Sequence, residues 1–448
     1  MIALVDANNF FVSCERALNP FIDSVPVVVL SNNDGCVIAR SNEVKDLGIP
    51  MGAPHFKYRD LMNTHNVRVY SVNFDLYNFF SKRIVSLLRN HSNQVQVYSV
   101  DESFIKLPKT YTSTPQIVKW RNRVEQSIKT AARIPVSIGI APTKTLAKLA
   151  SEELKTLGRS GLSKIESKSE DIGIVITQPQ IFSLLEKTFI QSVWGIGPKL
   201  AARLRRDNIK RASDLVACQD DWVRHNYGIV GLRIKYELLG LSSMPFEAGD
   251  TDRKGISSTR SFGTIVYSFA DLRSSIIKHL QIATRKLRRQ GSVAGKISIF
   301  IRTGKHRSGS QYYGKTYEVL MLPTDNVLHL NSLIDEMLSR IYRPNIAYYR
   351  SGVLLSDIQP AREVRGQLQF MDDGESQFNH RTRTTELLDR MQNLYGQNIL
   401  RPACIPSNPA WLPKSQNKSY SQSLAEKDRL PVIKLDKVEG YCRRGTNL

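Results

Sequence analysis

Short apolar runs alternate with amphipathic stretches along the N-terminal part of the chain, which is the pattern of a mixed α and β fold. Residues 2–5 are all apolar and lead directly into Asp6. Residues 95–100 alternate in polarity, are rich in β-branched and aromatic side chains, and lead into Asp101 and Glu102. Both runs therefore predict strands that end at acidic residues.

These three acidic side chains are candidates for a metal site. If both strands belong to one sheet, their spacing of about 5 Å brings the carboxylates of Asp6, Asp101 and Glu102 within reach of shared cations. Mg²⁺ prefers carboxylate and phosphate oxygens. Two such ions about 3.5–4 Å apart can activate an attacking 3′-oxygen and neutralise a leaving pyrophosphate. The alternative is that each acid only forms a turn or caps a helix.

A strand-to-helix passage at residues 136–155 adds a row of basic side chains. Pro142 and the threonine after it favour the start of a helix, and apolar residues recur behind them at helical spacing. The apolar stripe leaves Lys144, Lys148 and Lys155 as candidates for binding a triphosphate. The alternative is an ordinary helix surface with solvated lysines.

The charge balance of the chain points to a polyanionic partner. Its 448 residues include 63 Lys and Arg against 41 Asp and Glu, which gives a net charge of +22 and a pI near 9.8. The length predicts roughly three or more domains. No apolar run is long enough to cross a membrane and the N-terminus lacks a basic signal region, so we expect a cytoplasmic protein with no membrane partner. The five cysteines show no CxxC spacing and are expected to be reduced.

The positive charge is concentrated in residues 253–310, which hold thirteen Lys or Arg and a single acid, Asp271. A helical pattern at residues 271–289 and a strand-like run at 296–301 lie within this segment. The pattern predicts a folded α+β module whose basic face contacts nucleic-acid backbones, where each neutralised phosphate releases counterions. An ordinary solvated surface is the alternative. The candidate DNA contacts are Arg260, Arg285, Arg288 and Arg302.

A second nucleic-acid signal is the Gly-x-Gly turn at Gly195 and Gly197, which opens a helix carrying Lys199 and Arg203. Such a turn leaves backbone N–H groups free to bind a phosphate oxygen without reading base sequence. A second glycine pair follows at positions 228 and 231, before another basic helix. Together the two predict a helix-hairpin-helix element, although a lone Gly-x-Gly could be a plain turn.

Four segments, taken together, resemble the Y-family DNA polymerases, most closely their UmuC type. They are residues 5–15, 31–40, 99–103 and 139–155, and they occur in the same order as in that family. The similarity covers residues 1 to about 415. It implies an α+β multidomain, right-hand polymerase. The implied domains are a palm at 1–18 and 74–167, small fingers at 19–73, a helix-hairpin-helix thumb at 168–243 and a DNA-binding little finger at 252–357.

The resemblance also implies roles for individual residues of the palm. Asp6, Asp101 and Glu102 would be the catalytic carboxylates, and the carbonyl of Ala7 would complete the shell of two Mg²⁺ ions. Phe11 occupies the position of the aromatic steric gate that rejects the 2′-hydroxyl of a ribonucleotide. Its alternative role is that of a core aromatic beside Phe10, which also belongs to the implied nucleotide pocket.

In the implied fingers, Ile38 and Ala39 would cover the nascent base pair. Asn42 and Lys45 fall where many members of the family place a Tyr and an Arg on the triphosphate, so Asn42 is a weaker candidate ligand than Lys45 or Lys155. This departure from the family pattern resembles the UmuC type itself.

The implied function is low-fidelity, template-directed DNA synthesis across damaged templates, during SOS mutagenesis, with primer-template DNA and a deoxynucleotide as substrates. Short fingers cover the base pair loosely, and in-line attack by the primer 3′-oxygen needs positioning and electrostatic stabilisation rather than covalent chemistry. Two alternatives belong to other classes: a nucleotide cyclase with a palm-type sheet, and a catalytically inert DNA-binding repair module. The Gly195 turn and the basic segment argue against the cyclase, and the intact acids argue against the inert module.

The tail from residue 358 to residue 448 is rich in Gln, Asn, Ser and Pro, and we expect it to be partly disordered and to bind partners. Within it, Gln367, Leu368, Phe370 and Met371 resemble the short peptide with which bacterial polymerases bind the sliding clamp. Met371 replaces the more usual aromatic residue. The resemblance also implies a UmuD′-like dimer and RecA as partners, with contacts that the sequence does not locate.

Overall fold

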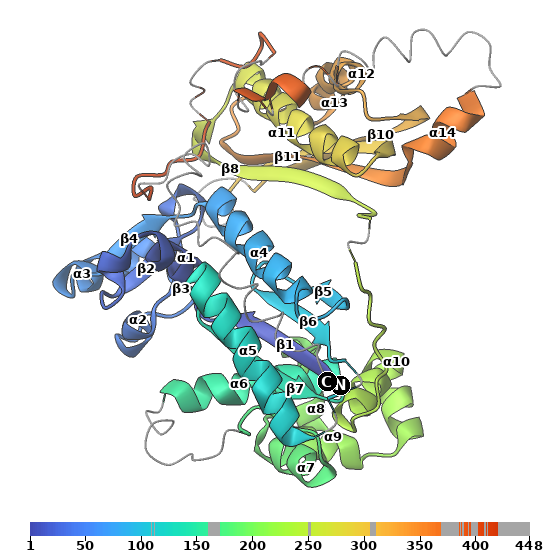
Figure 1. Ribbon diagram of the computed structural model, residues 1–448. Helices are drawn as coiled ribbons and strands as arrows, with labels where there is room; N and C mark the ends of the chain where they lie inside the picture. The colour runs from blue at the N-terminus through green and yellow to red at the C-terminus, as the bar shows by residue number, and fades with distance from the viewer. Residues whose placement is uncertain are drawn as a thin grey trace, which may run out of the picture. The chain divides into compact units, whose positions relative to one another are not determined.

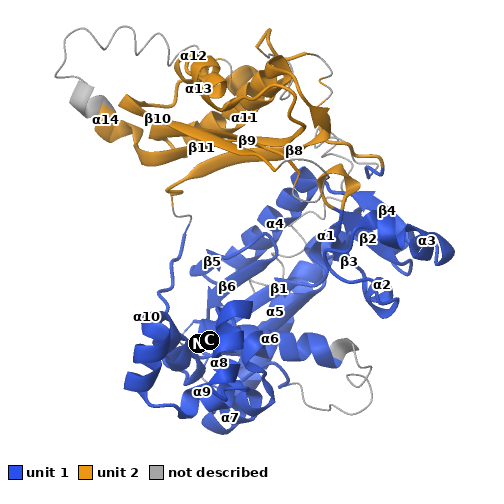
Figure 2. Cartoon of the chain, turned by 180° about the vertical axis from the view of Figure 1, so that it is seen from behind, with its two compact units in different colours: residues 1–30, 36–250, 417–448 blue, residues 31–35, 251–416 orange. Residues whose placement is uncertain are grey.

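The computed structural model, shown in Figure 1, describes most of the chain. The described residues are 1–108, 110–111, 113–159, 171–249, 252–304 and 311–368, with parts of 385–419. The chain divides into two compact units, coloured in Figure 2. The first unit comprises residues 1–30, 36–250 and 417–448, and the second comprises residues 31–35 and 251–416. Among the described helices, none is both long enough and apolar enough to span a membrane.

A four-stranded antiparallel sheet forms the centre of the first unit, with the strand order β5-β6-β1-β7. Its strands are β1 (Ile2–Ala7), β5 (Val95–Val97), β6 (Glu102–Lys106) and β7 (Val136–Ala141). Helices α4 (Phe74–Arg89) and α5 (Thr114–Ala132) contribute to the core on one face, and α6 (Lys144–Arg159) contributes to the core on the other. Side chains alternate along β1, so Asp6 shares the α6 face with Ile2 and Leu4.

The predicted strand at residues 95–100 is shorter in the structure than expected. Strand β5 ends at Val97, and the backbone N–H groups of Tyr98 and Ser99 both donate to the carbonyl of Glu102, at 3.1 Å each. This turn reverses the chain, so Glu102 begins a new strand, β6, and it is β6 that pairs with β1. The prediction that the run of residues 95–100 forms one strand ending at the acids was wrong in this detail, because the hairpin turn spans residues 98–101 and includes Asp101.

Helix α6 lies very close to the sheet because Gly139 in β7 has no side chain. A Cβ atom at this position would come within 2.2 Å of the carbonyl oxygen of Ala147 and within 2.3 Å of the backbone nitrogen of Ser151. Both of those residues lie in the middle of α6. The glycine therefore sets the distance between the helix and the strands, and with it the reach of the lysines on α6.

A smaller three-stranded sheet, β3-β2-β4, and its helices form a separate part of the first unit. This part has a core of its own that includes Val28, Leu30, Val44 and Met62. Helix α1 connects it to the central sheet and contributes to the larger core. The elements are α1 (Phe10–Leu18), a 3₁₀ helix at Pro20–Ile22, β2 (Val27–Leu30), β3 (Val37–Arg40), α2 (Asn42–Asp46), α3 (His55–Thr64) and β4 (Arg68–Ser71).

Four helices complete the first unit and contain the predicted helix-hairpin-helix element. They are α7 (Gln178–Lys187), α8 (Pro198–Arg206), α9 (Ala212–Ala217) and α10 (Asp220–Leu238), with a 3₁₀ helix at Ile190–Ser192. The predicted turn is present, since Gly195 has a φ of 91° and Gly197 caps α8 directly before Pro198. Gly228 has a φ of 67° and interrupts α10, so the second glycine signal divides one helix rather than opening a new one.

The second unit is a four-stranded antiparallel sheet, β10-β9-β11-β8, with helices packed on one face. The predicted helix at residues 271–289 is α11, and the predicted strand at 296–301 lies within β9. A 3₁₀ helix at Asn32–Asp34 also belongs to this unit. The elements are β8 (Ile256–Val266), α11 (Phe269–Arg289), β9 (Ser292–Arg302), β10 (Tyr313–Thr324), α12 (Val327–Ser332), α13 (Ile334–Ile341), β11 (Tyr348–Pro360) and α14 (Ala361–Leu368).

Parts of the predicted tail are structural. Strand β11 continues to Pro360, so the boundary expected at residue 357 falls inside it. Ile405 and Trp411 are buried in the core of the second unit, and the indole N–H of Trp411 donates to the hydroxyl of Ser274 at 2.8 Å. These two apolar residues stand in a Pro-rich stretch without any periodic pattern, which is why the sequence analysis assigned the stretch to a partly disordered tail.

Candidate active site

The predicted acids come together at one end of the central sheet. Asp6 and Glu102 are direct partners in the antiparallel pairing of β1 with β6, a position that brings their Cβ atoms to about 5 Å. The carbonyl of Asp101 accepts a hydrogen bond from the N–H of Ala7 at 2.9 Å. The hydroxyl of Ser99 donates to the Asp101 carboxylate. The structure thus brings Asp6, Ala7, Asp101 and Glu102 into one place.

Two lysines of α6 neutralise two of these carboxylates. Lys155 forms an ion pair with Asp6, and the ammonium of Lys148 lies 2.6 Å and 2.8 Å from the two carboxylate oxygens of Glu102. The pKa of Asp6 is raised to about 6, chiefly by burial and to a smaller extent by the charges of Glu102 and Asp101, against the lowering influence of Lys155. The charges of Glu102 and Asp101 therefore act on Asp6.

The donor set fits a divalent hard cation such as Mg²⁺, because it consists of oxygens that already attract positive charge. The two lysine ammonium groups stand where cations bind to Asp6 and Glu102. With the side chains in this arrangement, no group of three or more His, Cys, Asp and Glu within the described part of the chain is gathered closely enough to hold a metal ion. A metal ion at Asp6 and Glu102 would compete with the ammonium groups of Lys155 and Lys148.

The three lysines of the strand-to-helix passage have different surroundings. Lys144 is buried, donates to the carbonyl of Pro245 at 2.6 Å, and lies between the rings of Phe104 and Phe246. It has a structural position, and the triphosphate hypothesis for it is not supported. Lys148 pairs with Glu102, as described above. Only Lys155 also lines the neighbouring cavity.

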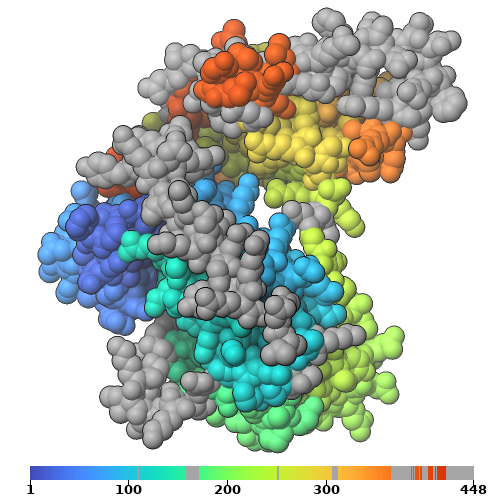
Figure 3. All heavy atoms as spheres, viewed as in Figure 1, coloured from blue at the N-terminus to red at the C-terminus, as the bar shows by residue number. Residues whose placement is uncertain are grey.

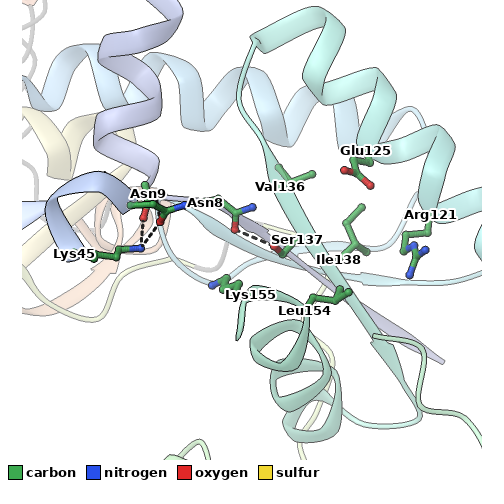
Figure 4. A pocket seen from close by; sticks show the side chains of 11 residues that line it. Asn8, Asn9, Lys45, Arg121, Glu125, Val136, Ser137, Ile138, Leu154 and Lys155 are labelled. Carbon is green, nitrogen blue, oxygen red and sulfur yellow. Dashed lines mark hydrogen bonds between the residues drawn. The ribbon is translucent and has the colours of Figure 1, made fainter. Parts of the chain in front are cut away.

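A polar cavity of about 420 Å³ shares Lys155 with the acids, since this lysine lines the cavity and pairs with Asp6. Figure 4 shows the residues that line the cavity. Its wall contains the three predicted phosphate ligands, Asn42, Lys45 and Lys155. Lys45 donates to the side-chain oxygens of Asn9 at 2.6 Å and Asn42 at 3.0 Å, so its ammonium is held at the cavity wall. The other lining residues are Asn8, Arg121, Glu125, Val136, Ser137, Ile138 and Leu154.

The sequence analysis missed Asn9 as a member of this cavity. Asn9 has a left-handed backbone with a φ of 48° and stands directly before α1. Asparagine tolerates this conformation better than most residues, because its short polar side chain hydrogen-bonds locally. An Asn directly before a helix was the available signal, and it indicates a helix start rather than a ligand.

The two aromatic residues at the start of α1 have different environments. Phe10 is buried in the core, whereas Phe11 is only partly buried. The ring of Phe11 stacks on Tyr77 with a centroid distance of 4.3 Å and an interplanar angle of 14°, and Phe74 meets it edge-on at 6.3 Å. Phe11 is therefore supported from one side and keeps exposed surface.

The predicted cover of the base pair lies on β3. Ile38 is partly buried against the same core that Phe11 contacts, and Ala39 is buried and pairs with Val29 of β2. The pairing of β3 with β2 skips Ile38, because the register shifts between the Val29–Ala39 and Leu30–Val37 pairs, as at a β-bulge. Of the two, Ile38 has the surface available for contact with a ligand.

The predicted DNA contacts of the thumb are exposed. The helix that follows the glycine turn presents Lys199 and Arg203 to solvent, and nothing lies within 4 Å of a Cβ built on Gly197. Figure 3 shows the thumb helices, in green, at the surface of the first unit. Gly195 is less open, since a Cβ there would lie 3.2 Å from Ile234. At this turn Gly195 packs closely against Ile234, whereas the N-terminus of α8 is exposed.

The predicted contacts of the second unit divide into two groups. Arg260 is exposed on β8, and Arg302 lies beside Arg350 on the face of the sheet opposite the helices. Arg285 is buried, and Arg288 is held by Asp389 at 2.7 Å and 2.9 Å. The structure therefore gives an exposed position to Arg260 and a partly exposed one to Arg302, whereas the two arginines of α11 have internal positions.

The predicted clamp-binding residues lie at the edge of the described chain. Gln367 and Leu368 are the last two residues of α14. Phe370 and Met371 lie outside the described residues. Their part in clamp binding stays a prediction.

Comparison with solved structures defines the class of fold. A Dbh–Dpo4 Y-family DNA polymerase chimera matches with a TM-score of 0.62 and 22% sequence identity, covering 80% of this chain and 99% of that one. An insertion ternary complex of Dbh DNA polymerase matches with a TM-score of 0.54, at 22% identity and the same coverage. The chain has the fold of a Y-family DNA polymerase.

Sequence relatives identify the family. Protein UmuC of Salmonella typhimurium is 30% identical over 96% of this chain and 100% of its own length, and Protein ImpB of the same species is 31% identical over 81% and 84%. DNA polymerase IV of Oceanobacillus iheyensis is 25% identical over 88% and 90%. The impB/mucB/samB family matches residues 5–152, and its C-terminal domain matches residues 253–370. The chain belongs to the impB/mucB/samB family, which confirms the resemblance to UmuC-type polymerases.

Proposed function

We propose that this protein is a template-directed, low-fidelity DNA polymerase that extends primers across damaged templates during the SOS response. Membership of the impB/mucB/samB family supports this function. The observation that carries it is the convergence of Asp6, Asp101 and Glu102 beside a polar cavity lined by Lys45 and Lys155. Carboxylates next to a cationic pocket are what nucleotidyl transfer from a deoxynucleoside triphosphate requires.

The carboxylates of Asp6, Asp101 and Glu102 and the carbonyl of Ala7 would hold two Mg²⁺ ions. When bound, Mg²⁺ activates the primer 3′-oxygen and neutralises the charge that develops on the pyrophosphate. The cations of Lys45 and Lys155 would hold the triphosphate in the cavity, and Asn42 would fix the orientation of Lys45. These residues position the reacting groups without forming a covalent bond to them.

Phe11 would select the sugar. Its ring has a fixed position on Tyr77, so it cannot move aside when a 2′-hydroxyl approaches. Ile38 would contact the nascent base pair from β3, whereas Ala39 and Phe10 are buried in the adjoining core. Because the part of the chain formed by β2–β4 is small, the cover over the base pair is limited. Poor shape discrimination and tolerance of lesions follow.

We propose that the primer-template duplex is held by the thumb and by the second unit. Gly195, Gly197, Lys199 and Arg203 would bind phosphates at the N-terminus of α8. Arg260 and Arg302 would add contacts from the sheet of the second unit. Arg285 and Arg288 would support this sheet from within rather than contact DNA, given the burial of the first and the ion pair of the second.

Further partners are proposed from the family alone. They are the sliding clamp, through Gln367, Leu368, Phe370 and Met371, and a UmuD′-like dimer and RecA, through surfaces that no described residue identifies. We place the protein in the cytoplasm, where its proposed substrates are found. No observation favours the cyclase or the inert DNA-binding module.

Primer extension on undamaged and abasic templates with Mg²⁺ tests the proposal. Asp101→Ala should abolish incorporation and leave duplex binding, measured by fluorescence anisotropy, within about twofold, because only the metal site is changed. Asp75→Ala, in the first turn of α4, is the matched control and should extend primers normally. Retained extension by Asp101→Ala would contradict the assignment. Loss of duplex binding would show that Asp101 has a structural role instead.

A further inference from the structure

A buried polar group lies directly behind the ring of Phe11. Glu15 of α1 is only 2% exposed, and its carboxylate accepts a hydrogen bond from the hydroxyl of Tyr77 at 2.8 Å. The ring of Tyr77, itself 1% exposed, is the surface on which Phe11 stacks. Glu15 therefore fixes the hydroxyl end of the side chain that supports Phe11.

The second partner of Glu15 comes from the far end of the chain. The Glu15 carboxylate also accepts a hydrogen bond from the side chain of Ser419, which is 5% exposed. The side-chain amide of Asn73 donates to the Ser419 hydroxyl at 3.3 Å, and Asn73 also caps α4, the helix that carries Tyr77. One serine of the tail thus joins both helices behind Phe11.

The backbone of the tail is fixed at this place as well. The N–H of Ser71, at the end of β4, donates to the carbonyl of Asn417 at 2.7 Å, and the N–H of Asn417 donates to the Ser71 hydroxyl at 3.0 Å. Ser71 is 1% exposed. These two hydrogen bonds to a buried residue set the register of the segment and direct Ser419 towards Glu15.

The chemistry of Glu15 explains why this contact matters. A carboxylate out of water requires hydrogen-bond donors, and removing one donor leaves the remaining acceptor capacity unsatisfied. Burial raises the pKa of Glu15 to about 7 even with Tyr77 and Ser419 as donors. Among the described residues, these two hydroxyls are the side-chain donors that the structure gives to Glu15. Without the donor from the tail, Tyr77 would be the remaining side-chain donor to Glu15 among the described residues.

We propose that residues 417–419 are an internal docking segment of the polymerase core, in which Ser419 and Glu15 act as positioning residues for the sugar-contacting ring of Phe11. In this proposal Ser419 positions Glu15, Glu15 positions the Tyr77 hydroxyl, and the Tyr77 ring positions Phe11. This inference rests on the proposed role of Phe11. It assigns to the C-terminal tail a part in nucleotide selection, in addition to its proposed part in binding partners.

The experiment compares Ser419→Ala with Lys418→Ala, a change of the exposed neighbouring residue, in the full-length protein. The readout is the ratio of kcat/KM for a deoxynucleotide to that for the matching ribonucleotide. Ser419→Ala should lower this ratio about three- to tenfold, chiefly through better use of the ribonucleotide, because one hydrogen bond to a buried charge is lost. Lys418→Ala should leave the ratio unchanged.

A conservative variant separates positioning from a general loss of structure. Glu15→Gln keeps an acceptor for both hydroxyls and should stay within about twofold of the wild-type ratio, whereas Glu15→Met, of similar size and without an acceptor, should resemble Ser419→Ala. Tyr77→Phe keeps the stacked ring and should show an intermediate loss. Equal ratios in Glu15→Met, Ser419→Ala and the wild type would overturn the proposal.

A measurement that does not involve catalysis distinguishes this proposal from the proposed function. Amide hydrogen exchange in α1 and in the first turns of α4 should be faster in Ser419→Ala than in Lys418→Ala, because the bonds that join these helices are lost. Unchanged exchange would show that the segment does not dock here. If hydrogen exchange is faster in Ser419→Ala and Phe11→Ala still rejects ribonucleotides, residues 417–419 dock as proposed and the proposed role of Phe11 is wrong.

Discussion

Asp6 and Glu102 lie directly opposite one another on β1 and β6, and each is paired with a different lysine of α6. Two carboxylates held this close repel each other unless positive charge lies between or beside them. Lys148 and Lys155 provide that charge from the same face of α6, about one turn and three turns after its start. The helix that Gly139 brings against the sheet therefore balances the acids in the absence of a metal ion.

This balance predicts the behaviour of Lys148→Met. The variant should lose about 1–2 kcal/mol of unfolding free energy without Mg²⁺, because Glu102 keeps its burial and loses its partner. Added Mg²⁺ should raise the Tm of this variant more than that of the wild type, since the metal no longer competes with the ammonium. Thermal melts with and without Mg²⁺ measure both effects. Lys82→Met, on α4, is the control, and equal shifts in all three proteins would contradict the prediction.

Phe11→Ala should admit ribonucleotides. Removal of the ring opens the space that a 2′-hydroxyl needs, while the carboxylates and the cavity lysines stay in place, so deoxynucleotide incorporation should fall much less than discrimination does. Single-nucleotide incorporation with dNTP and rNTP pairs measures the change, which we expect to exceed about tenfold. Unchanged sugar selection would show that Phe11 is only a core aromatic, like Phe10.

Gly139→Ala should destabilise the palm. A methyl group at this position meets the backbone of α6 at Ala147 and Ser151, and backbone cannot rotate away as a side chain can. The helix must move outward, at a cost of about 1–3 kcal/mol or more. The displacement also withdraws the lysines of α6 from the acids. The raised pKa of Asp6 and the affinity of the acids for metal ions should therefore change together. Chemical denaturation measures the loss, and Gly255→Ala, whose methyl has about 3.9 Å of room, should be nearly neutral.

Much of this site could be predicted from local sequence. The acids follow β-rich runs, the lysines stand on a helix with an apolar stripe, and the glycine turn precedes a proline, so short-range patterns determined them. The strand that pairs Glu102 with Asp6 could not be predicted in the same way, because its start depends on a hairpin turn inside a continuous β-rich run. Judged by its composition alone, the run of residues 95–100 would form one strand that continues through the turn.

Contacts between segments that are far apart in the sequence could not be predicted from local patterns. Ser419 meets Asn73 across 346 residues of sequence, and nothing in the polar tail marks it as buried. Lys144 was expected on the open side of its helix and is instead covered by Phe246, which follows the thumb in the chain. Arg285 and Arg288 count towards a basic face in composition, but burial and an acid of the tail, Asp389, give them internal positions.

Lys199→Ala should weaken duplex binding by a similar factor on all sequences. The side chain stands at the exposed N-terminus of α8 and would neutralise one phosphate, so the slope of log affinity against log salt should fall by about 1. Anisotropy titrations at several salt concentrations measure the slope. Lys187→Ala, an exposed lysine at the end of α7, is the control. A change confined to one DNA sequence would contradict phosphate contact.

His279 gives the second unit a pH-dependent stability. The side chain is 2% exposed within α11, its Nδ1 lies 3.0 Å from the Ser258 hydroxyl, and burial, with a smaller effect from Arg260, lowers its pKa from 6.5 to about 3. Below pH 6.5 the unfolded chain takes up a proton at this residue and the folded chain does not. The unfolding free energy should therefore decrease as the pH falls, by up to about 1.4 kcal/mol per pH unit from this residue.

His279→Gln, which cannot titrate, isolates this contribution. The variant should lose stability at neutral pH because the packing around Ser258 changes, and it should show a shallower decrease between pH 6.5 and pH 4 than the wild type does. Hydrogen exchange of the α11 amides in the full-length chain, corrected for the intrinsic pH dependence of exchange, measures both slopes. Parallel slopes would mean that His279 becomes protonated in the folded state, which would require water or an acceptor to reach its Nε2 atom, an atom that is buried and has no hydrogen-bond partner among the described residues.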